Sequence, residues 1–158
     1  MSSNARIGVI VAALAAAAVA VALAVSFVSL RKASNAQLCA GNLRILYMAI
    51  RTGELLDSPR WDAVGTGRAF IADVEAWPTL QRRDFDPCCP VKGTRNDIDY
   101  RGPALPPRRL KPDDPFLADR PGNHGPEKGG NVVFKDGRIV EASPSDEAWV
   151  RAAITTAD

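Results

Sequence analysis

The sequence has few of the residues from which enzymes and nucleic-acid-binding proteins build their sites. Its 158 residues include a single histidine, His124, and three cysteines. After residue 30 there are 19 Lys and Arg (20 in the chain less Arg6) against 18 Asp and Glu, so the charge is nearly balanced. Because there is no basic stripe, we expect no nucleic-acid partner. No nucleophile and base are placed beside each other, so we expect no enzyme activity and no cofactor.

Charge is missing altogether from residues 7–30, a run of 24 residues with no Asp, Glu, Lys or Arg. As a helix this run measures roughly 36 Å, enough to cross a hydrocarbon core of about 30 Å, and it satisfies its own backbone groups in lipid. We therefore expect a short tail at 1–6, then a single-pass membrane helix at 7–30 in contact with the lipid bilayer. The alternatives are a buried core helix and a cleaved signal peptide ending near Ala36. The length of the run favours retention over cleavage.

The charges that flank this run do not fix its orientation. Arg6 precedes it, whereas Arg31 and Lys32 follow it, so the positive-inside count by itself leans toward a cytoplasmic C-terminus. Three cysteines fit one disulfide and one spare thiol in an oxidising compartment, with a connectivity that the sequence leaves open. Zinc is the other use of thiols, but the cysteines lack metal-ligand spacing and only one histidine accompanies them. We expect no metal site of this kind.

The apolar pattern continues beyond the membrane run. Residues 31–53 are predicted to extend the same helix amphipathically as far as Gly53, because their apolar side chains recur every three or four residues. The side chains expected to face a small domain at 54–158 are Leu38, Cys39, Leu43, Leu46, Ala49 and Ile50.

Two further helices and a hairpin are predicted in that domain. Residues 67–77 have an apolar face and stop before Pro78. Asp136-Gly137 lies between two β-rich runs, 131–135 and 138–142, and predicts a two-residue hairpin turn, with Val132 and Phe134 on one face. A last helix is expected to begin at Ser143 as N-cap, with Pro144 in its first turn. Its packing residues are expected to be Trp149, Val150, Ala153 and Ile154.

Between these elements the chain changes in composition. Ten of the twelve prolines lie in residues 78–126, so we expect a surface loop there, with one short strand near 97–101. The oxygen-bearing side chains in this loop are Asp113, Asp114, Asp119 and Asn123, which form a weak candidate calcium site because no EF-hand spacing is present. The alternative, which we favour, is that they cap turns.

Several segments resemble bacterial prepilin-type (pseudopilin-like) proteins of the planctomycete type. Cys39-Ala40-Gly41-Asn42-Leu43-Arg44 is similar to the Cys-x-x-Asn-Leu-Arg segment of that family, and Cys89-Pro90 to its Cys-Pro motif. His124, followed by Asp136-Gly137, is similar to the closing His…Asp-Gly signature, with a longer spacing here. The resemblance implies an α+β, pilin-like fold: a long N-terminal helix packed on a small antiparallel sheet. From its position between Asn123 and Gly125, just before the hairpin, His124 is expected to bond loop backbone, with a metal or a partner contact as the alternatives.

This resemblance implies a function as well. A membrane-anchored structural or accessory subunit of a type II secretion or type IV pilus-like apparatus is expected, single-pass in the inner membrane with an extracytoplasmic domain. Its partners would be pilin-like or secretion-system subunits bound through the helix. A disulfide from Cys39 to Cys89 is expected, with Cys88 as the alternative partner. Unlike the proteins that it resembles, the chain has no Gly-Phe-Thr processing site and no acid in 7–30, which favours the alternative of a stand-alone anchored or secreted binding module.

Overall fold

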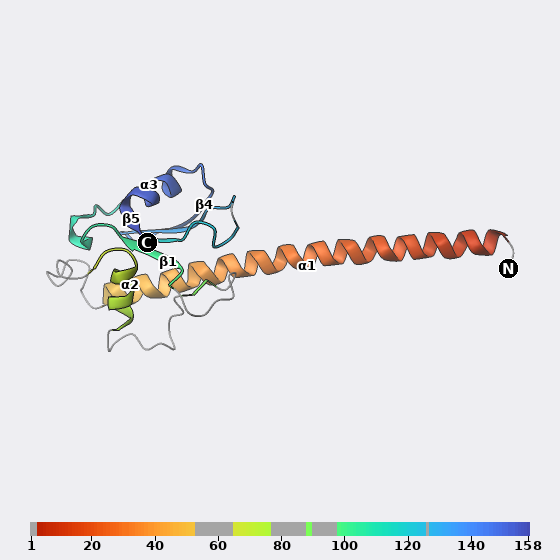
Figure 1. Ribbon diagram of the computed structural model, residues 1–158, viewed down its shortest axis with the longest axis horizontal. Helices are drawn as coiled ribbons and strands as arrows, with labels where there is room; N and C mark the ends of the chain where they lie inside the picture. Colours follow the sequence, from red (N-terminus) through yellow and green to blue (C-terminus); the bar gives the residue numbers. More distant parts are fainter. Residues whose placement is uncertain (1–2, 53–64, 77–87, 90–97, 126) are drawn as a thin grey trace. The chain divides into compact units, whose positions relative to one another are not determined.

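The computed structural model describes residues 3–52, 65–76, 88–89, 98–125 and 127–158 (Figure 1). The chain divides into two compact units, Met1–Ser34 and Asn35–Asp158. The first unit is helical throughout its described part, and the second holds a small sheet with helices. The fold is therefore α+β, as predicted.

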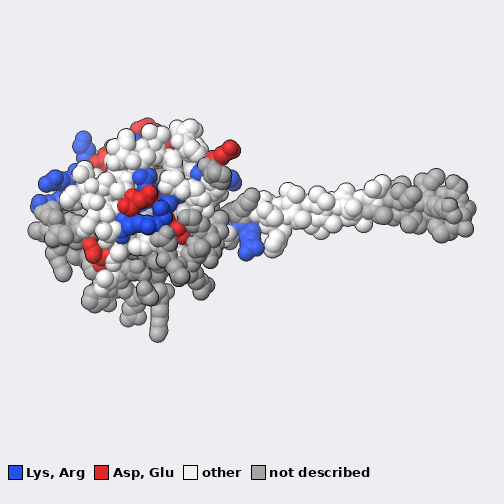
Figure 2. Space-filling view, viewed as in Figure 1, with Lys and Arg blue, Asp and Glu red and all other residues white. Residues whose placement is uncertain are grey.

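Helix α1 runs without a break over Ser3–Thr52, which confirms the single helix expected from the apolar pattern. It contains one stretch that is long and apolar enough to cross a membrane by length and composition. Within the first unit its large apolar side chains are exposed, from Leu14 (66%) to Leu30 (69%). Figure 2 shows that charged residues are interspersed over the visible face of the second unit. Residues 14–30 of α1 contain no charged residue.

The sheet has five strands in the order β4-β3-β2-β1-β5, and every neighbouring pair is antiparallel. All five strands follow α2 in the chain, with a 3-10 turn between β1 and β2 and a helix between β4 and β5. Their bounds are α2 Arg68–Glu75, β1 Tyr100–Pro103, η3 Pro107–Arg109, β2 Pro115–Asp119, β3 Gly130–Phe134, β4 Ile139–Ala142, α3 Glu147–Thr155 and β5 Thr156–Ala157.

The proline-rich segment 78–126 is not only a surface loop, and here the sequence prediction was wrong. It contributes two of the five strands, and β2, the central one, is fully buried. Its prolines do not break the sheet because Pro115 begins β2 and Pro103 ends β1, positions at which a missing backbone donor is tolerated. The predicted short strand near 97–101 corresponds to the beginning of β1.

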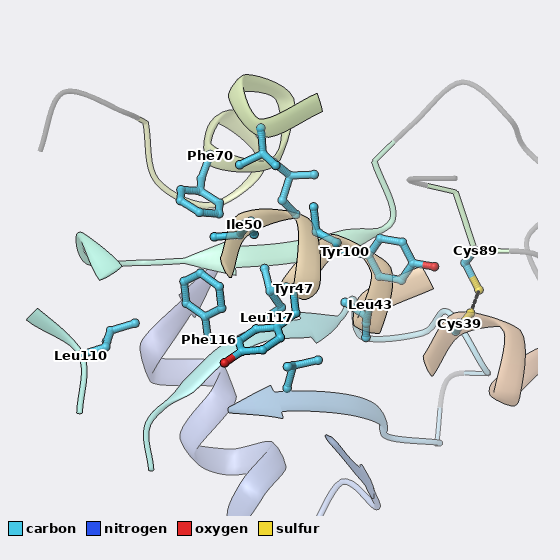
Figure 3. Close-up of a cluster of buried hydrophobic side chains, with 14 residues drawn as sticks. Cys39, Leu43, Tyr47, Ile50, Phe70, Cys89, Tyr100, Leu110, Phe116 and Leu117 are labelled. Atoms are coloured by element: carbon cyan, nitrogen blue, oxygen red, sulfur yellow. Dashed lines mark hydrogen bonds between the residues drawn. The ribbon is translucent and has the colours of Figure 1, made fainter. Parts of the chain in front are cut away.

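The larger core lies between the sheet, α1 and α2 (Figure 3). Phe116 of β2 is at its centre, with ring centroids 6.2 Å from Tyr47 and 5.7 Å from Phe70, both edge-on. A register shift between Pro115 and Leu117 lets consecutive β2 residues face the same core, as a bulge does. The other fully buried large residues of this core are Leu43, Leu46, Ile50, Ile71, Val74, Tyr100, Leu117 and Val133.

The face of α1 that packs on the domain is narrower than predicted. Cys39, Leu43, Leu46 and Ile50 are buried as expected, whereas Leu38 is 54% exposed and Ala49 is only partly buried. Leu38 follows the apolar three-and-four spacing but is too far round the helix to reach the sheet, because successive residues advance by about 100°.

The smaller core, on the other face of the sheet, is covered by α3. Val132 and Phe134 belong to it together, as their alternation predicted. The face of α3 that packs there consists of Ala148, Trp149 and Ala152. The rest of the α3 prediction was wrong: Val150 (51% exposed), Ala153 and Ile154 (76% exposed) face outward.

The start of α3 also differs from the prediction. The N-cap is Asp146, not Ser143, and the helix begins at Glu147. The Asp146 carboxylate accepts a hydrogen bond from the Ser143 backbone N–H at 2.7 Å, so Ser143 and Pro144 form the turn that precedes the helix. Both segments suit a helix start in composition, and the helix begins at the later one although the Asp146 side chain makes no capping hydrogen bond to it.

The β3–β4 hairpin is confirmed, but its loop is longer than the predicted two residues. Phe134 N–H bonds Arg138 O at 2.9 Å and Gly137 N–H bonds Phe134 O at 2.9 Å, which leaves three residues in the loop. Gly137 has φ 94°, and this is the three-residue hairpin with glycine in the left-handed region. The loop lies on α1, because Tyr47 Oη donates to Lys135 O at 2.7 Å.

Candidate functional site

Two cysteines from distant parts of the sequence meet at one end of the larger core (Figure 3). The Cys39 Sγ of α1 and the Cys89 Sγ are 3.2 Å apart, and both residues are buried (0% and 1% exposed). The predicted pairing is thus present as proximity, but no disulfide joins these two sulfur atoms. A covalent bond would need a separation of about 2.05 Å.

His124, in the loop after β2, joins this pair. One ligand atom each from Cys39, Cys89 and His124 lies within 4.8 Å of the others, and this is the only such cluster of His, Cys, Asp or Glu among the residues that the structure describes. The zinc possibility that the sequence spacing argued against is therefore geometrically present. The three residues are far apart in the chain, so no local motif could show it.

Asp119, the last residue of β2, orients the histidine. Its buried Oδ2 is 2.9 Å from His124 Nε2 and accepts hydrogen bonds from the backbone N–H (2.7 Å) and the side-chain amide (2.8 Å) of Asn131. Gly130 is required beside it, because a Cβ at that position would be 2.7 Å from the Asp119 Cβ. His124 was expected to bond loop backbone, and its recorded partner is instead this carboxylate.

A second set of contacts holds Cys89 and the histidine loop together. Asp99 Oδ2 accepts a hydrogen bond from the Cys89 backbone N–H at 2.9 Å. The Asp99 carbonyl accepts bonds from the Asn123 side-chain amide at 2.6 Å and from the Arg120 N–H at 3.2 Å. Asp99 and Asn123 are both buried. Through these bonds the positions of Cys89 and His124 are fixed relative to β1 and β2.

Helix α1 contributes a third set of hydrogen bonds near the cluster. Asn42, one turn beyond Cys39, donates to Tyr100 Oη at 3.1 Å (part-buried), while Asn131 Nδ2 also donates to the Ala36 carbonyl at 3.3 Å. The Asn of the Cys-x-x-Asn segment therefore helps to fix α1 against β1. Together these bonds bring the cysteine, asparagine and histidine motifs to one place.

Burial and neighbouring groups shift the acid–base properties of this cluster. The contact with Cys89, together with burial, raises the pKa of the Cys39 thiol and so favours its protonated form. Burial raises the pKa of Tyr100 well above its usual range, which keeps it neutral. For His124, the hydrogen bond to Asp119 raises the pKa and outweighs the opposing effect of burial.

The other motif residues lie elsewhere. Leu43 is part of the larger core, and Arg44 is exposed on α1. Asp136 and Gly137 form the hairpin loop that touches Tyr47. Pro90 lies outside the described residues, and Cys88 is buried but does not belong to the cluster with His124.

The four candidate calcium ligands do not converge. Asp114 bonds Arg151 at 3.1 Å and lies just before β2, whereas Asp119 ends that strand beside His124. Asp113 also faces Arg151, at 3.8 Å. Five residues of extended chain hold the two groups of acids apart, at roughly 3.3 Å per residue. The oxygens therefore serve an ion pair and a buried hydrogen-bond network.

Sequence reasoning missed the framework residues Asp99, Tyr100 and Asn131. No pattern marks them, because each acts through a contact made only in the folded domain. Chemically, the cluster offers two sulfur atoms and an imidazole, which are ligands for soft and borderline metal ions or substrates for oxidation. No family model, no curated protein and no solved structure matches this chain.

Proposed function

We propose that this protein is a membrane-anchored, pilin-like structural or accessory subunit of a type II secretion or type IV pilus-like apparatus, assembled through α1. The resemblance of its cysteine, asparagine and His…Asp-Gly segments to prepilin-type proteins supports the family. The single apolar helix supports the anchor.

The observation that carries the assembly role is an exposed apolar stripe on α1 within the second unit. Leu38, Ile45 and Met48 are 54%, 41% and 54% exposed, and they recur at steps of seven and three residues. This spacing places them on one face of the helix, as in a helix–helix seam. Gly41 lies on the same face, where a Cβ would meet nothing within 4 Å. The stripe is separate from the face that α1 buries in the domain.

The proposed interface can be tested with one substitution. Ile45→Glu places a charge in the stripe without touching the core, so we expect it to remove crosslinks between α1 and its neighbours. A photo-crosslinking amino acid at Leu38, with and without Ile45→Glu, measures this in intact membranes. The products are identified by mass spectrometry.

Arg44→Glu is the matched control, since Arg44 is exposed on the adjoining polar face of the same turn. It should leave the crosslinks intact. The proposal fails if Leu38 yields no crosslink to pilin-like or secretion subunits or to a second copy, or if both substitutions reduce the crosslinks equally.

The alternative function is a stand-alone anchored or secreted binding module with no pilus role. It is favoured by the absence of any acid in residues 7–30, because resembling pilins use a Glu there to pair with a neighbour's N-terminus. The intact mass of protein from the soluble fraction would establish the secreted form if it matched a chain that begins near Gln37.

We also propose that the second unit lies on the extracytoplasmic side of the inner membrane. An alkaline phosphatase fused after Asp158 should then be active, and a fluorescent protein that folds only in the cytoplasm should be dark. The opposite pair of results would show that Arg31 and Lys32 set the orientation and that the domain is cytoplasmic.

A further inference from the structure

The Cys39, Cys89 and His124 cluster is built like a metal centre. We propose that these three residues bind one zinc ion, which fastens α1 to the Cys89 segment and to the loop after β2. This inference does not depend on the proposed assembly role.

The first argument is the separation of the sulfur atoms. Two thiolates on a tetrahedral zinc ion, each at about 2.3 Å from the metal, lie roughly 3.8 Å apart. Cys39 Sγ and Cys89 Sγ are 3.2 Å apart, so they must separate by about 0.6 Å to hold zinc. They would have to approach by about 1.1 Å to form a disulfide. The metal needs the smaller movement.

The second argument is the histidine. A disulfide has no use for an imidazole, yet one ring nitrogen of His124 lies within 4.8 Å of both cysteine sulfur atoms. Its Nε2 is held by Asp119 at 2.9 Å, which leaves Nδ1 for a metal. A carboxylate on the second nitrogen is the usual support of a zinc-bound histidine, because it fixes the ring and makes it a stronger ligand.

The third argument is charge. Asp119 is fully buried, and its Oδ1 has no hydrogen-bond partner in the described part of the chain. Among the described residues, the one basic side chain within ion-pair distance of the Asp119 carboxylate is His124. A divalent cation beside the histidine would offset this buried negative charge. Zinc would replace the two thiol protons, which pass to solvent, so binding involves no oxidation or reduction.

Three protein ligands leave a fourth position in a tetrahedral zinc site, which water fills in sites of this ligand number. The cluster is buried, with the His124 side chain 10% exposed, so the ion would act chiefly as a structural clamp. Its three ligands come from segments separated by 50 and 35 positions, and joining them would stabilise the folded domain.

The test uses the full chain in detergent micelles, reduced and freed of metal under anaerobic conditions, then titrated with cobalt(II) as a spectroscopic substitute for zinc. We expect one equivalent to produce a thiolate-to-cobalt charge-transfer band, and zinc to abolish it by displacement. Protein isolated without reductant should carry about one zinc per chain by elemental analysis. Its intact mass should match free thiols.

Five variants locate the site. Cys39→Ser and Cys89→Ser should lose the charge-transfer band, whereas Cys88→Ser, at the adjacent buried cysteine outside the cluster, should keep it. His124→Cys should keep binding but intensify the band, which shows that position 124 is a ligand even if His124→Ala fails to fold. Asp119→Asn should weaken cobalt affinity about 10–100-fold while the band remains.

Three results would overturn the proposal. The first is a wild-type titration without a thiolate band. The second is a band that survives in both Cys39→Ser and Cys89→Ser or disappears in Cys88→Ser. The third is native protein whose mass is two hydrogens lower, with Cys39 and Cys89 mapped to a disulfide.

Discussion

Replacing Asp119 by alanine is expected to lower the free energy of unfolding of the second unit by about 3–5 kcal/mol, as removal of one partner of a buried ionic contact does. The carboxylate is fully buried and accepts from the Asn131 backbone and side chain, beside His124 Nε2. Its loss leaves the buried Asn131 backbone N–H without this acceptor, and the Asn131 side-chain amide keeps only its bond to the Ala36 carbonyl. Urea unfolding of the full chain in detergent, followed by near-ultraviolet circular dichroism with a chelator present, measures the loss.

Two further substitutions show which part of that effect is electrostatic. Asp119→Asn keeps the shape and one oxygen acceptor, so we expect a smaller loss than in Asp119→Ala. Asp113→Ala is the surface control, because its side chain is 65% exposed and 3.8 Å from Arg151, and such pairs contribute about 0–1 kcal/mol. Equal stability of Asp119→Asn and the wild type would show that the negative charge is not needed.

The second large effect is expected at the hairpin. Gly137→Ala should cost about 2–4 kcal/mol, because φ is 94° there and a Cβ would be 2.8 Å from the Tyr47 ring. Tyr47 cannot move aside freely, since its hydroxyl donates to Lys135 O and accepts from Arg51. The same unfolding experiment measures the change.

Gly122→Ala separates the two causes. Gly122 also has a positive φ, 85°, but a Cβ there meets nothing within 4 Å, so only the backbone cost of about 1–2 kcal/mol is expected. If the two alanine variants are equally stable, the Tyr47 contact contributes nothing. Combining Gly137→Ala with Tyr47→Leu should cost less than the sum of the single changes, since the smaller side chain leaves room for the new methyl group.

The sequence alone predicted the elements whose signals are local. The continuous helix, α2 and the β3–β4 hairpin each follow from periodicity or turn residues within a dozen positions. Local signals did not decide between competing solutions. Both Ser143 and Asp146 suit a helix N-cap, and α3 has two apolar faces, of which the one with Trp149 and Ala152 packs on the sheet.

The central strand escaped prediction for a physical reason. Pro115-Phe116-Leu117-Ala118-Asp119 is short, begins with proline and ends with an acid, all of which indicate a loop when neighbours are unknown. Pairing with β1 and β3 on both sides provides the backbone partners that make it a strand. A strand of this kind depends on contacts that sequence windows do not contain.

What the sequence by itself determined is the apolar helix, the hairpin and the motif residues that suggest a pilin-like protein. What only the tertiary structure decided is which of those residues meet. Cys39 and Cys89 are 50 positions apart and His124 another 35 beyond, so their meeting depends on the sheet register, on Asp99 and on Asp119. Sequence spacing reveals a cluster of cysteine and histidine only when its members share one local element, and here the fold brings Cys39, Cys89 and His124 together from three separate segments.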